Sequence, residues 1–118
     1  MRHRKEGKKF NRIASRRRSF LRNLASDLIR AEKIETTEAR AKAIRPIVER
    51  LVTIAKKQDL AARRLLFTRL HNMRVVDKLY HDIAPRYATR AGGYLRISKL
   101  AKTRVRDGVK VAQIEFVK

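Results

Sequence analysis

Residues 15–31 read SRRRSFLRNLASDLIRA, and this stretch carries the clearest helical pattern of the chain. Its large apolar residues and Ala25 recur at positions 20, 21, 24, 25, 28 and 29, which is the spacing of one face of an α-helix. Such a face is best used against a core formed with later elements. We therefore predict a helix over residues 15–31, with Ser15 as its N-cap.

The first turn of this helix holds Arg16, Arg17 and Arg18, at the end where backbone N–H groups already present positive charge. Acidic side chains are favoured there, so folding alone does not explain three arginines. A solvated charge run is the alternative interpretation. Phosphate groups would be attracted both to the arginines and to the helix N-terminus, and the pattern therefore favours anion binding.

Basic residues extend from this helix back to the start of the chain. Residues 1–22 carry ten Lys or Arg residues and one acidic residue, and residues 1–14 show no sustained periodicity. We predict a basic irregular arm over residues 1–14, followed by a single domain over residues 15–118. The formal net charge of +21 over 118 residues favours a polyanionic partner, which could be nucleic acid, an acidic membrane or an acidic protein.

The rest of the chain alternates helical and strand-like patterns. We predict a strand at 33–36, helices at 37–57, 59–70 and 72–85, and strands at 94–100 and 109–117 that pair as a hairpin. The order α-β-α-α-α-β-β predicts an α+β fold, a two-layer domain with its helices packed on a small sheet. We expect the last strand to bury Ala112, Ile114 and Phe116.

Helix boundaries and buried faces are predicted from individual residues. Polar residues suited to cap a helix precede the last three predicted helices. They are Thr36 or Thr37 for the second helix, Asp59 for the third and Asn72 for the fourth. Pro46 is expected to kink or divide the second helix, and Pro85 to end the fourth. On the third helix the expected buried residues are Leu60, Leu66, Phe67 and Leu70.

No pattern of an enzyme is present. His3, His71 and His81 do not form a metal-ligand spacing, and the chain contains no Cys. The glycines match neither a phosphate-binding loop nor a dinucleotide turn, and no G-x-S-x-G motif occurs. We expect no catalytic residue, no metal, no cofactor and no small-molecule substrate.

A membrane role is the weakest interpretation. No run approaches the ~18 apolar residues of a membrane span, and the basic start does not lead into the apolar segment of a secretory signal. A mitochondrial transit peptide over residues 1–30 remains a minor alternative.

Nucleic acid remains as the favoured partner. The two helices that meet at His71 and Asn72 resemble a helix-turn-helix pair, so architectural binding of double-stranded DNA is an alternative. The fourth helix, however, offers few side chains that read bases. Because basic residues come from arm, helices and loops alike, the pattern favours a folded RNA surface. The candidate RNA-binding residues are Arg2, His3, Arg4, Lys5, Lys8, Lys9, Arg12, Arg16, Arg17, Arg18, Arg22, Arg63, Arg64, Arg86, Tyr87, Arg90, Tyr94 and Arg96.

Several motifs together closely resemble the bacterial large-subunit ribosomal protein seventeen family. They are MRHRKEGKKFNR, RNL at 22–24, IETTEARAKAIRP, RRL at 63–65, PRYATRAGGYLRISKL and VAQIEFV, and the resemblance covers essentially the whole chain. It implies a structural protein of the large ribosomal subunit near the peptide exit tunnel, in a bacterial or organellar ribosome. The implied partners are large-subunit rRNA, contacted by the arm and first helix, and neighbouring ribosomal proteins. The resemblance also implies the same α-β-α-α-α-β-β order.

Overall fold

The structure is a computed structural model that describes residues 7–118, so the predictions for Arg2, His3, Arg4 and Lys5 lie outside the described residues. In chain order the elements are α1 (Ala14–Ala31), β1 (Lys33–Thr37), α2 (Glu38–Ala55), α3 (Leu60–Leu70), α4 (Met73–Asp77), the π-helical segment η1 (Lys78–Ile83), α5 (Ala84–Arg86), β2 (Leu95–Thr103) and β3 (Lys110–Phe116). The segments α4, η1 and α5 follow one another without a break and form the fourth helix of the predicted order. The α+β fold class is confirmed.

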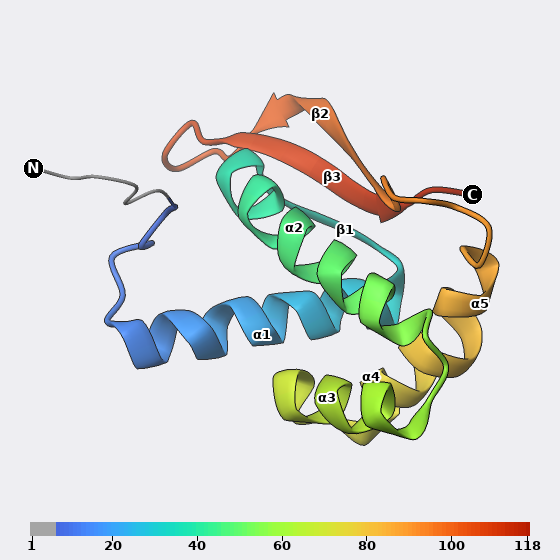
Figure 1. Cartoon of the computed structure of the whole chain (residues 1–118). Coiled ribbons are helices and arrows are strands. Elements are labelled where there is room, and N and C mark those ends of the chain that lie inside the picture. The colour runs from blue at the N-terminus through green and yellow to red at the C-terminus, as the bar shows by residue number, and fades with distance from the viewer. Residues whose placement is uncertain (1–6) are drawn as a thin grey trace, which may run out of the picture.

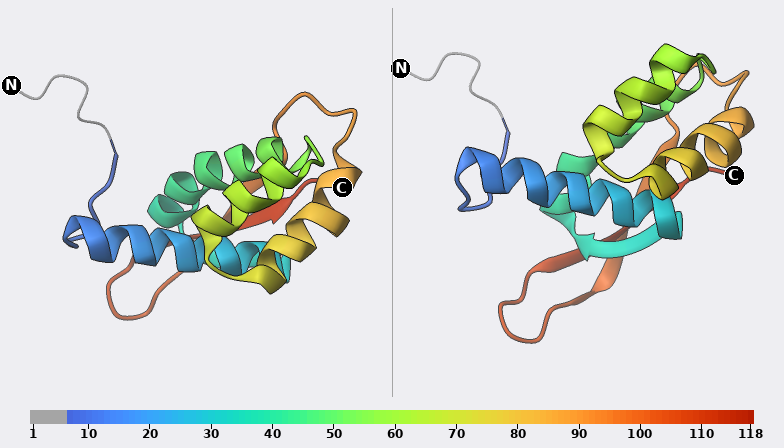
Figure 2. Two further views of the ribbon diagram at one scale, coloured as in Figure 1. Left: turned by 60° about the horizontal axis from the view of Figure 1, so that its bottom comes forward. Right: turned by 90° about the horizontal axis from the view of Figure 1, so that it is seen from below.

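The three strands form one antiparallel sheet in the order β1-β3-β2. Ile114 in the central strand lies opposite Ile34 on one side and Ile97 on the other. The predicted hairpin of the last two strands is confirmed, and so is the burial of Ala112, Ile114 and Phe116. The helices lie on one side of this sheet, with α2 next to it and α1 and α3 further away (Figures 1 and 2).

The core lies around α2, which is covered by the sheet on one side and by the other helices on the other. Ile44, Val48 and Val52 of α2 are fully buried. They belong to one cluster with Leu28 of α1 and Ile114 of β3. Of the apolar face predicted for the first helix, Ala25, Leu28 and Ile29 are buried and fix α1 against the domain, while Phe20, Leu21 and Leu24 are half-buried.

Three of the predicted helix caps are confirmed. Thr37 accepts a hydrogen bond from the backbone N–H of Arg40, Asp59 accepts from Ala62 at 2.7 Å, and Asn72 accepts from Arg74 and Val75. The prediction for Ser15 is wrong. Helix α1 begins one residue earlier, and its N-cap is Ile13, which has no polar side chain to offer.

Neither proline ends a helix. Pro46 lies inside α2 without dividing it, because it removes only one backbone donor from an 18-residue helix. The prediction that Pro85 ends the fourth helix is wrong, since helical structure continues to Arg86. In the preceding π-helical turn the Ala84 N–H bonds to the Leu79 carbonyl, five residues back. The π-helical turn thus lies directly before Pro85, where the proline removes a backbone donor.

Helix α3 buries a different face from the predicted one. Leu66 and Leu70 are buried as expected, but Leu60 and Phe67 are 60% and 44% exposed. Ala62 takes their place, so that the buried residues are spaced by four. The helix carries apolar residues on more than one face, and its neighbours cover only one of them.

Candidate nucleic-acid interface

The described part of the arm folds back on the start of α1. The Phe10 ring lies 5.5 Å from the Phe20 ring of α1, and the Arg12 guanidinium lies 4.0 Å from the centre of the same ring. Arg40 of α2 approaches Phe20 from another side, at 5.1 Å. Phe20 therefore joins arm, α1 and α2, and these contacts hold Arg12 beside the first turns of α1.

The first turn of α1 has none of the usual stabilising features of a helix start. It contains no acidic residue, and no side chain caps it. Arg16 and Arg18 are exposed, while Arg17 donates a hydrogen bond to the Arg12 carbonyl at 3.4 Å. This end of α1 stands out from the rest of the domain (Figures 1 and 2). Its positive charge is therefore both concentrated and accessible.

The carboxylates of the domain are engaged elsewhere. Within residues 7–118, every Asp and Glu except Asp59 is paired with a cation. The cations in these pairs are Arg30, Lys42, Arg45, Arg63, Lys78, Arg86, Arg96, Lys99, Lys102 and Arg104. No pair in that range includes a cation before residue 30.

We call the cations of residues 7–22 the α1 basic surface: Lys8, Lys9, Arg12, Arg16, Arg17, Arg18 and Arg22. All of them come from the sequence prediction, and the structure brings them together on the arm and the first half of α1. No carboxylate among the described residues neutralises any of them. A dense set of uncompensated cations is the electrostatic footprint of a nucleic-acid-binding surface.

Three other predicted arginines lie in ion pairs that join elements. Arg63 of α3 pairs with Asp77 of α4 at 2.6 Å, and Arg96 of β2 pairs with Glu115 of β3 at 2.6 Å. Arg86 contacts Glu32 and also pairs with Asp82. The hydrogen bond from Arg96 lowers the pKa of Glu115, so this pair is held as two charges. The structure thus compensates these arginines locally, unlike the α1 basic surface.

The two predicted tyrosines lie inside the domain. Tyr87 and Tyr94 are buried with their rings 5.2 Å apart, and burial raises the pKa of the Tyr87 hydroxyl. The Tyr87 hydroxyl donates to the Val117 carbonyl at 2.5 Å, and that of Tyr94 accepts from Lys56 at 3.0 Å. Both tyrosines therefore pack in the core, and RNA contact by them stays a prediction.

Arg64 and Arg90 are the last two predicted cations. Arg64 is exposed on α3 and belongs to none of the ion pairs found within residues 7–118. Arg90 is also exposed, but its Nε donates to the Gly92 carbonyl at 3.1 Å and so closes its own loop. Arg64 is therefore as available to a polyanion as the α1 basic surface, whereas Arg90 is partly committed to the turn.

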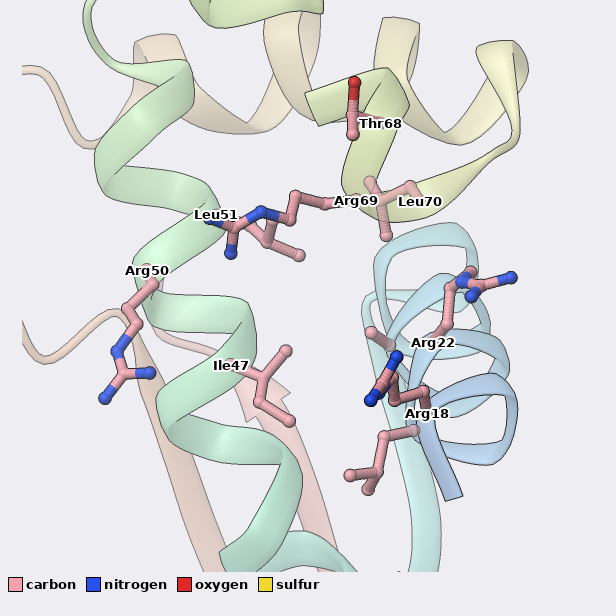
Figure 3. A pocket seen from close by; sticks show the side chains of 10 residues that line it. Arg18, Arg22, Ile47, Arg50, Leu51, Thr68, Arg69 and Leu70 are labelled. Atoms are coloured by element: carbon pink, nitrogen blue, oxygen red, sulfur yellow. The ribbon is translucent and has the colours of Figure 1, made fainter. Parts of the chain in front are cut away.

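A pocket of about 330 Å³ lies next to the α1 basic surface. Two of the arginines that line it were not among the predicted RNA-binding residues. Arg50 of α2 and Arg69 of α3 line this pocket together with Arg18 and Arg22 of α1 (Figure 3). We call it the arginine pocket. Its other lining residues are Leu21, Ala25, Ile47, Leu51, Thr68 and Leu70. A signal exists in the sequence, since Arg50 and Arg69 each directly precede a leucine that is buried.

Comparison with known proteins identifies the family. The sequence profile of the family described as ribosomal protein L17 matches residues 20–117. The chain belongs to the ribosomal protein L17 family. This confirms the resemblance inferred from the motifs, and as a member of a family of structural ribosomal proteins the chain is not an enzyme.

Two relatives in the L17 family cover almost the whole chain. The large ribosomal subunit protein bL17 of Hydrogenobaculum sp. (strain Y04AAS1) is 49% identical over 117 residues, which are 99% of this chain and 99% of the relative. The protein of the same name from Allorhizobium ampelinum (strain ATCC BAA-846 / DSM 112012 / S4) is 52% identical over 99% of this chain and 82% of the relative. A bacterial member of the L17 family works in the ribosome, and therefore in the cytoplasm.

No helix within residues 7–118 is long and apolar enough to cross a membrane. In the same part of the chain no group of His, Cys, Asp and Glu residues could hold a metal ion.

Proposed function

We propose that this chain is a structural constituent of the large ribosomal subunit that binds folded large-subunit rRNA through its arm and α1. Membership of the L17 family and the names of both bacterial relatives support the place in the large subunit. The observation that carries the RNA-binding part is the separation of charges. Ten of the 22 Lys and Arg residues at 23–118 form ion pairs with carboxylates, whereas none of the seven cations of the α1 basic surface does so within residues 7–118.

The mechanism is neutralisation of phosphates by a surface that is held in shape before binding. Arg16, Arg17 and Arg18 sit where the N-terminal N–H groups of α1 add their own positive potential. Arg12 is positioned by the Phe20 ring, so part of the arm is ordered against α1. Guanidinium groups match phosphate geometry with two parallel hydrogen bonds, which suits contacts between separate RNA strands.

The other predicted residues contribute less to RNA binding than the α1 basic surface, or extend it. Arg64 is free to contact a phosphate, and Arg2, His3, Arg4 and Lys5 extend the same basic run toward the start of the chain. Arg63, Arg86 and Arg96 keep an internal ion pair and contribute less to RNA affinity. Residues 1–14 act as the arm and residues 15–118 as one domain.

The position near the peptide exit tunnel and the contacts with neighbouring ribosomal proteins belong to the same proposal. They are supported by the resemblance to the family over the whole chain. Crosslinking of this chain in assembled large subunits tests both, with crosslinks to rRNA and to proteins beside the tunnel opening as the expected result. Crosslinks confined to other parts of the subunit would contradict the tunnel position.

The RNA-binding proposal is tested by charge-matched variants. In the first variant Arg16, Arg17 and Arg18 are each changed to Gln. This removes three positive charges that have no acidic partner among the described residues. In the control variant Arg30, Arg45 and Arg104 are changed to Gln, which removes the same formal charge from residues that form ion pairs. Binding to large-subunit rRNA is measured over a series of salt concentrations.

We expect the first variant to reduce the log-log salt slope by about 2 to 3, at roughly 0.7 to 0.9 for each lost phosphate contact. The control should change the slope by less than about 1, because its arginines already have partners. A chain starting at Ala14 belongs in the same series and should bind weakly but still unfold cooperatively. Equal slopes for both triple variants would refute the proposed surface. Equal competition by duplex DNA would support the architectural DNA-binding alternative instead.

A further inference from the structure

The arginine pocket has an apolar floor between three helices. Leu21 and Ala25 of α1 face Ile47 and Leu51 of α2, and Leu70 closes the end at α3. In Figure 3 Ile47 points into the space between α1 and α2, and Arg69 reaches from α3 toward Leu51. Ile47 and Leu21 are only half-buried, so apolar side chains remain accessible at this place in the domain.

The rim of the arginine pocket is positive throughout. Arg18, Arg22, Arg50 and Arg69 line it, and no acidic residue does. None of the four is in an ion pair within residues 7–118, although every carboxylate of that range except Asp59 is. The Nη1 atom of Arg22 lies 3.3 Å from Nδ1 of His71, which follows α3 and does not itself line the pocket. In Figure 3 the side chains of Arg18 and Arg69 extend toward the space between α1 and α2, while those of Arg22 and Arg50 extend outward beside it. Cations gathered in this way repel each other unless an anion joins them.

An occupant of this pocket must combine a flat apolar part with negative charge. A free phosphate would leave the apolar floor unused, and an apolar side chain would leave the arginines that line the pocket without an anionic partner. A nucleotide has both parts, because its base is a flat ring with a hydrophobic face and its phosphates are anionic. Unpaired bases in folded RNA are turned out of the stack and packed on apolar side chains and guanidinium planes.

We propose that the arginine pocket receives one unstacked nucleotide of the large-subunit rRNA, with its base on Leu21, Ile47 and Leu51 and its flanking phosphates on the arginines. The inference rests on the proposed rRNA binding and adds a specific contact to it. The volume of about 330 Å³ lies at the small end of the ~300–1,000 Å³ usual for ligand pockets, which suits a single nucleotide. Because Arg18 and Arg22 also belong to the α1 basic surface, the bound backbone continues directly onto α1.

The test fills the pocket without changing any charge. Ile47→Trp places a large side chain on the floor of the pocket, and Ile54→Trp is the matched control. Ile54 lies two turns further along α2, is half-buried like Ile47 and does not line the pocket. Leu21→Trp fills the pocket from α1 and guards against a folding defect peculiar to Ile47→Trp. Full-length chains are bound to large-subunit rRNA over the same series of salt concentrations, and circular dichroism checks their folding.

We expect both pocket-filling variants to bind about tenfold more weakly than Ile54→Trp, with an unchanged salt slope, since only the base contact is lost. Acylation of RNA 2′-hydroxyl groups should then reveal one nucleotide whose reactivity differs between the wild-type and Ile47→Trp complexes. Wild-type affinity and identical reactivity for folded Ile47→Trp and Leu21→Trp would overturn the pocket proposal, while the salt slope would still support the α1 basic surface. If the affinity of the wild-type chain for large-subunit rRNA did not depend on salt concentration, the proposed function itself would be contradicted.

Discussion

At the scale of single residues, Glu32 connects several parts of the domain. It follows α1 in a left-handed conformation with φ of 64°, and its backbone carbonyl accepts a hydrogen bond from Phe116 at 3.1 Å. Its carboxylate contacts Arg86 and lies 3.5 Å from Lys78. The Arg86 hydrogen bond is the main cause that lowers the pKa of Glu32 below its ordinary value of 4.5.

This lowered pKa gives a prediction about acid stability. A carboxylate with a lowered folded-state pKa stabilises the fold above its unfolded-state pKa, and the contribution is lost as pH falls through the folded-state value. We expect Glu32→Gln to reduce the free energy of unfolding at neutral pH by up to about 1 kcal/mol, because the site is partly solvated. The difference from wild type should shrink below about pH 4.

Urea unfolding at several pH values measures this effect. Glu35→Gln is the control, because Glu35 pairs only with Lys102 and both side chains are about half-exposed or more. A constant difference between Glu32→Gln and wild type across the acidic range would show that the ion pairs of Glu32 do not stabilise the fold.

The sequence alone predicted those residue roles that depend on neighbouring residues in the chain, such as helix capping. Asp59 and Asn72 cap helices because their short side chains reach N–H groups two or three residues ahead, which depends only on nearby residues. The ion pair between Arg63 and Asp77 joins residues 14 apart, and that between Arg86 and Glu32 joins residues 54 apart. Such partners depend on the tertiary fold, so the difference between compensated and uncompensated arginines was not predictable.

At the scale of elements, α1 combines a buried apolar face with an electrostatically unfavourable start. Leu28 and Ile29 in its second half are fully buried, whereas its first two turns carry Arg16, Arg17 and Arg18 and its start has no side-chain cap. The packed half can hold the helix in place while the projecting half remains available for binding. Stability and binding therefore make opposite demands on the first turn.

Arg16→Glu tests this conflict. A carboxylate near the N-terminus of α1 interacts favourably with the helix dipole, so we expect the free protein to gain about 0.3 to 1 kcal/mol of stability. Affinity for large-subunit rRNA should fall, with a salt slope reduced by about 1. Thermal unfolding and RNA binding are measured on the same preparations.

Arg106→Glu makes the same charge change in the exposed loop between β2 and β3 and serves as the control. Any general relief of repulsion in a chain with a net charge of +21 would appear equally in both variants. Equal stabilisation and equal RNA binding by the two variants would argue against a special role for the start of α1.

Element order was predictable from hydrophobic periodicity, but two details depend on tertiary structure. The fourth helix passes Pro85 directly after the π-helical turn of η1, and nothing in the local pattern indicates that turn. Helix α3 has apolar residues on more than one face, so its sequence does not determine whether Leu60 or Ala62 is buried. The packing of α2 and α4 decides that choice.

At the scale of the whole molecule, ion pairs separate two groups of cations. One group pairs with carboxylates across α3, α4, α5 and the sheet. The other has no acidic partner among the described residues; it contains all of the α1 basic surface and the arginine pocket, and also exposed cations elsewhere such as Arg74 and Arg106. The sequence predicted that the chain binds a polyanion, while only the structure shows that no carboxylate pairs with the cations of the arm and the first half of α1 within residues 7–118.

The most direct test of this arrangement measures which side of the molecule lies against rRNA in assembled large subunits. Because the chain has no Cys, Ser19→Cys and Ala88→Cys each give a single attachment point for an iron chelate that cleaves nearby RNA through hydroxyl radicals. Both residues are exposed, and they adjoin Arg18 of the α1 basic surface and the ion-paired Arg86 region respectively. We predict strong rRNA cleavage from residue 19 and much weaker cleavage from residue 88. Equal cleavage from both positions, or stronger cleavage from residue 88, would contradict the claim that the unpaired cations of α1 are the RNA-binding side.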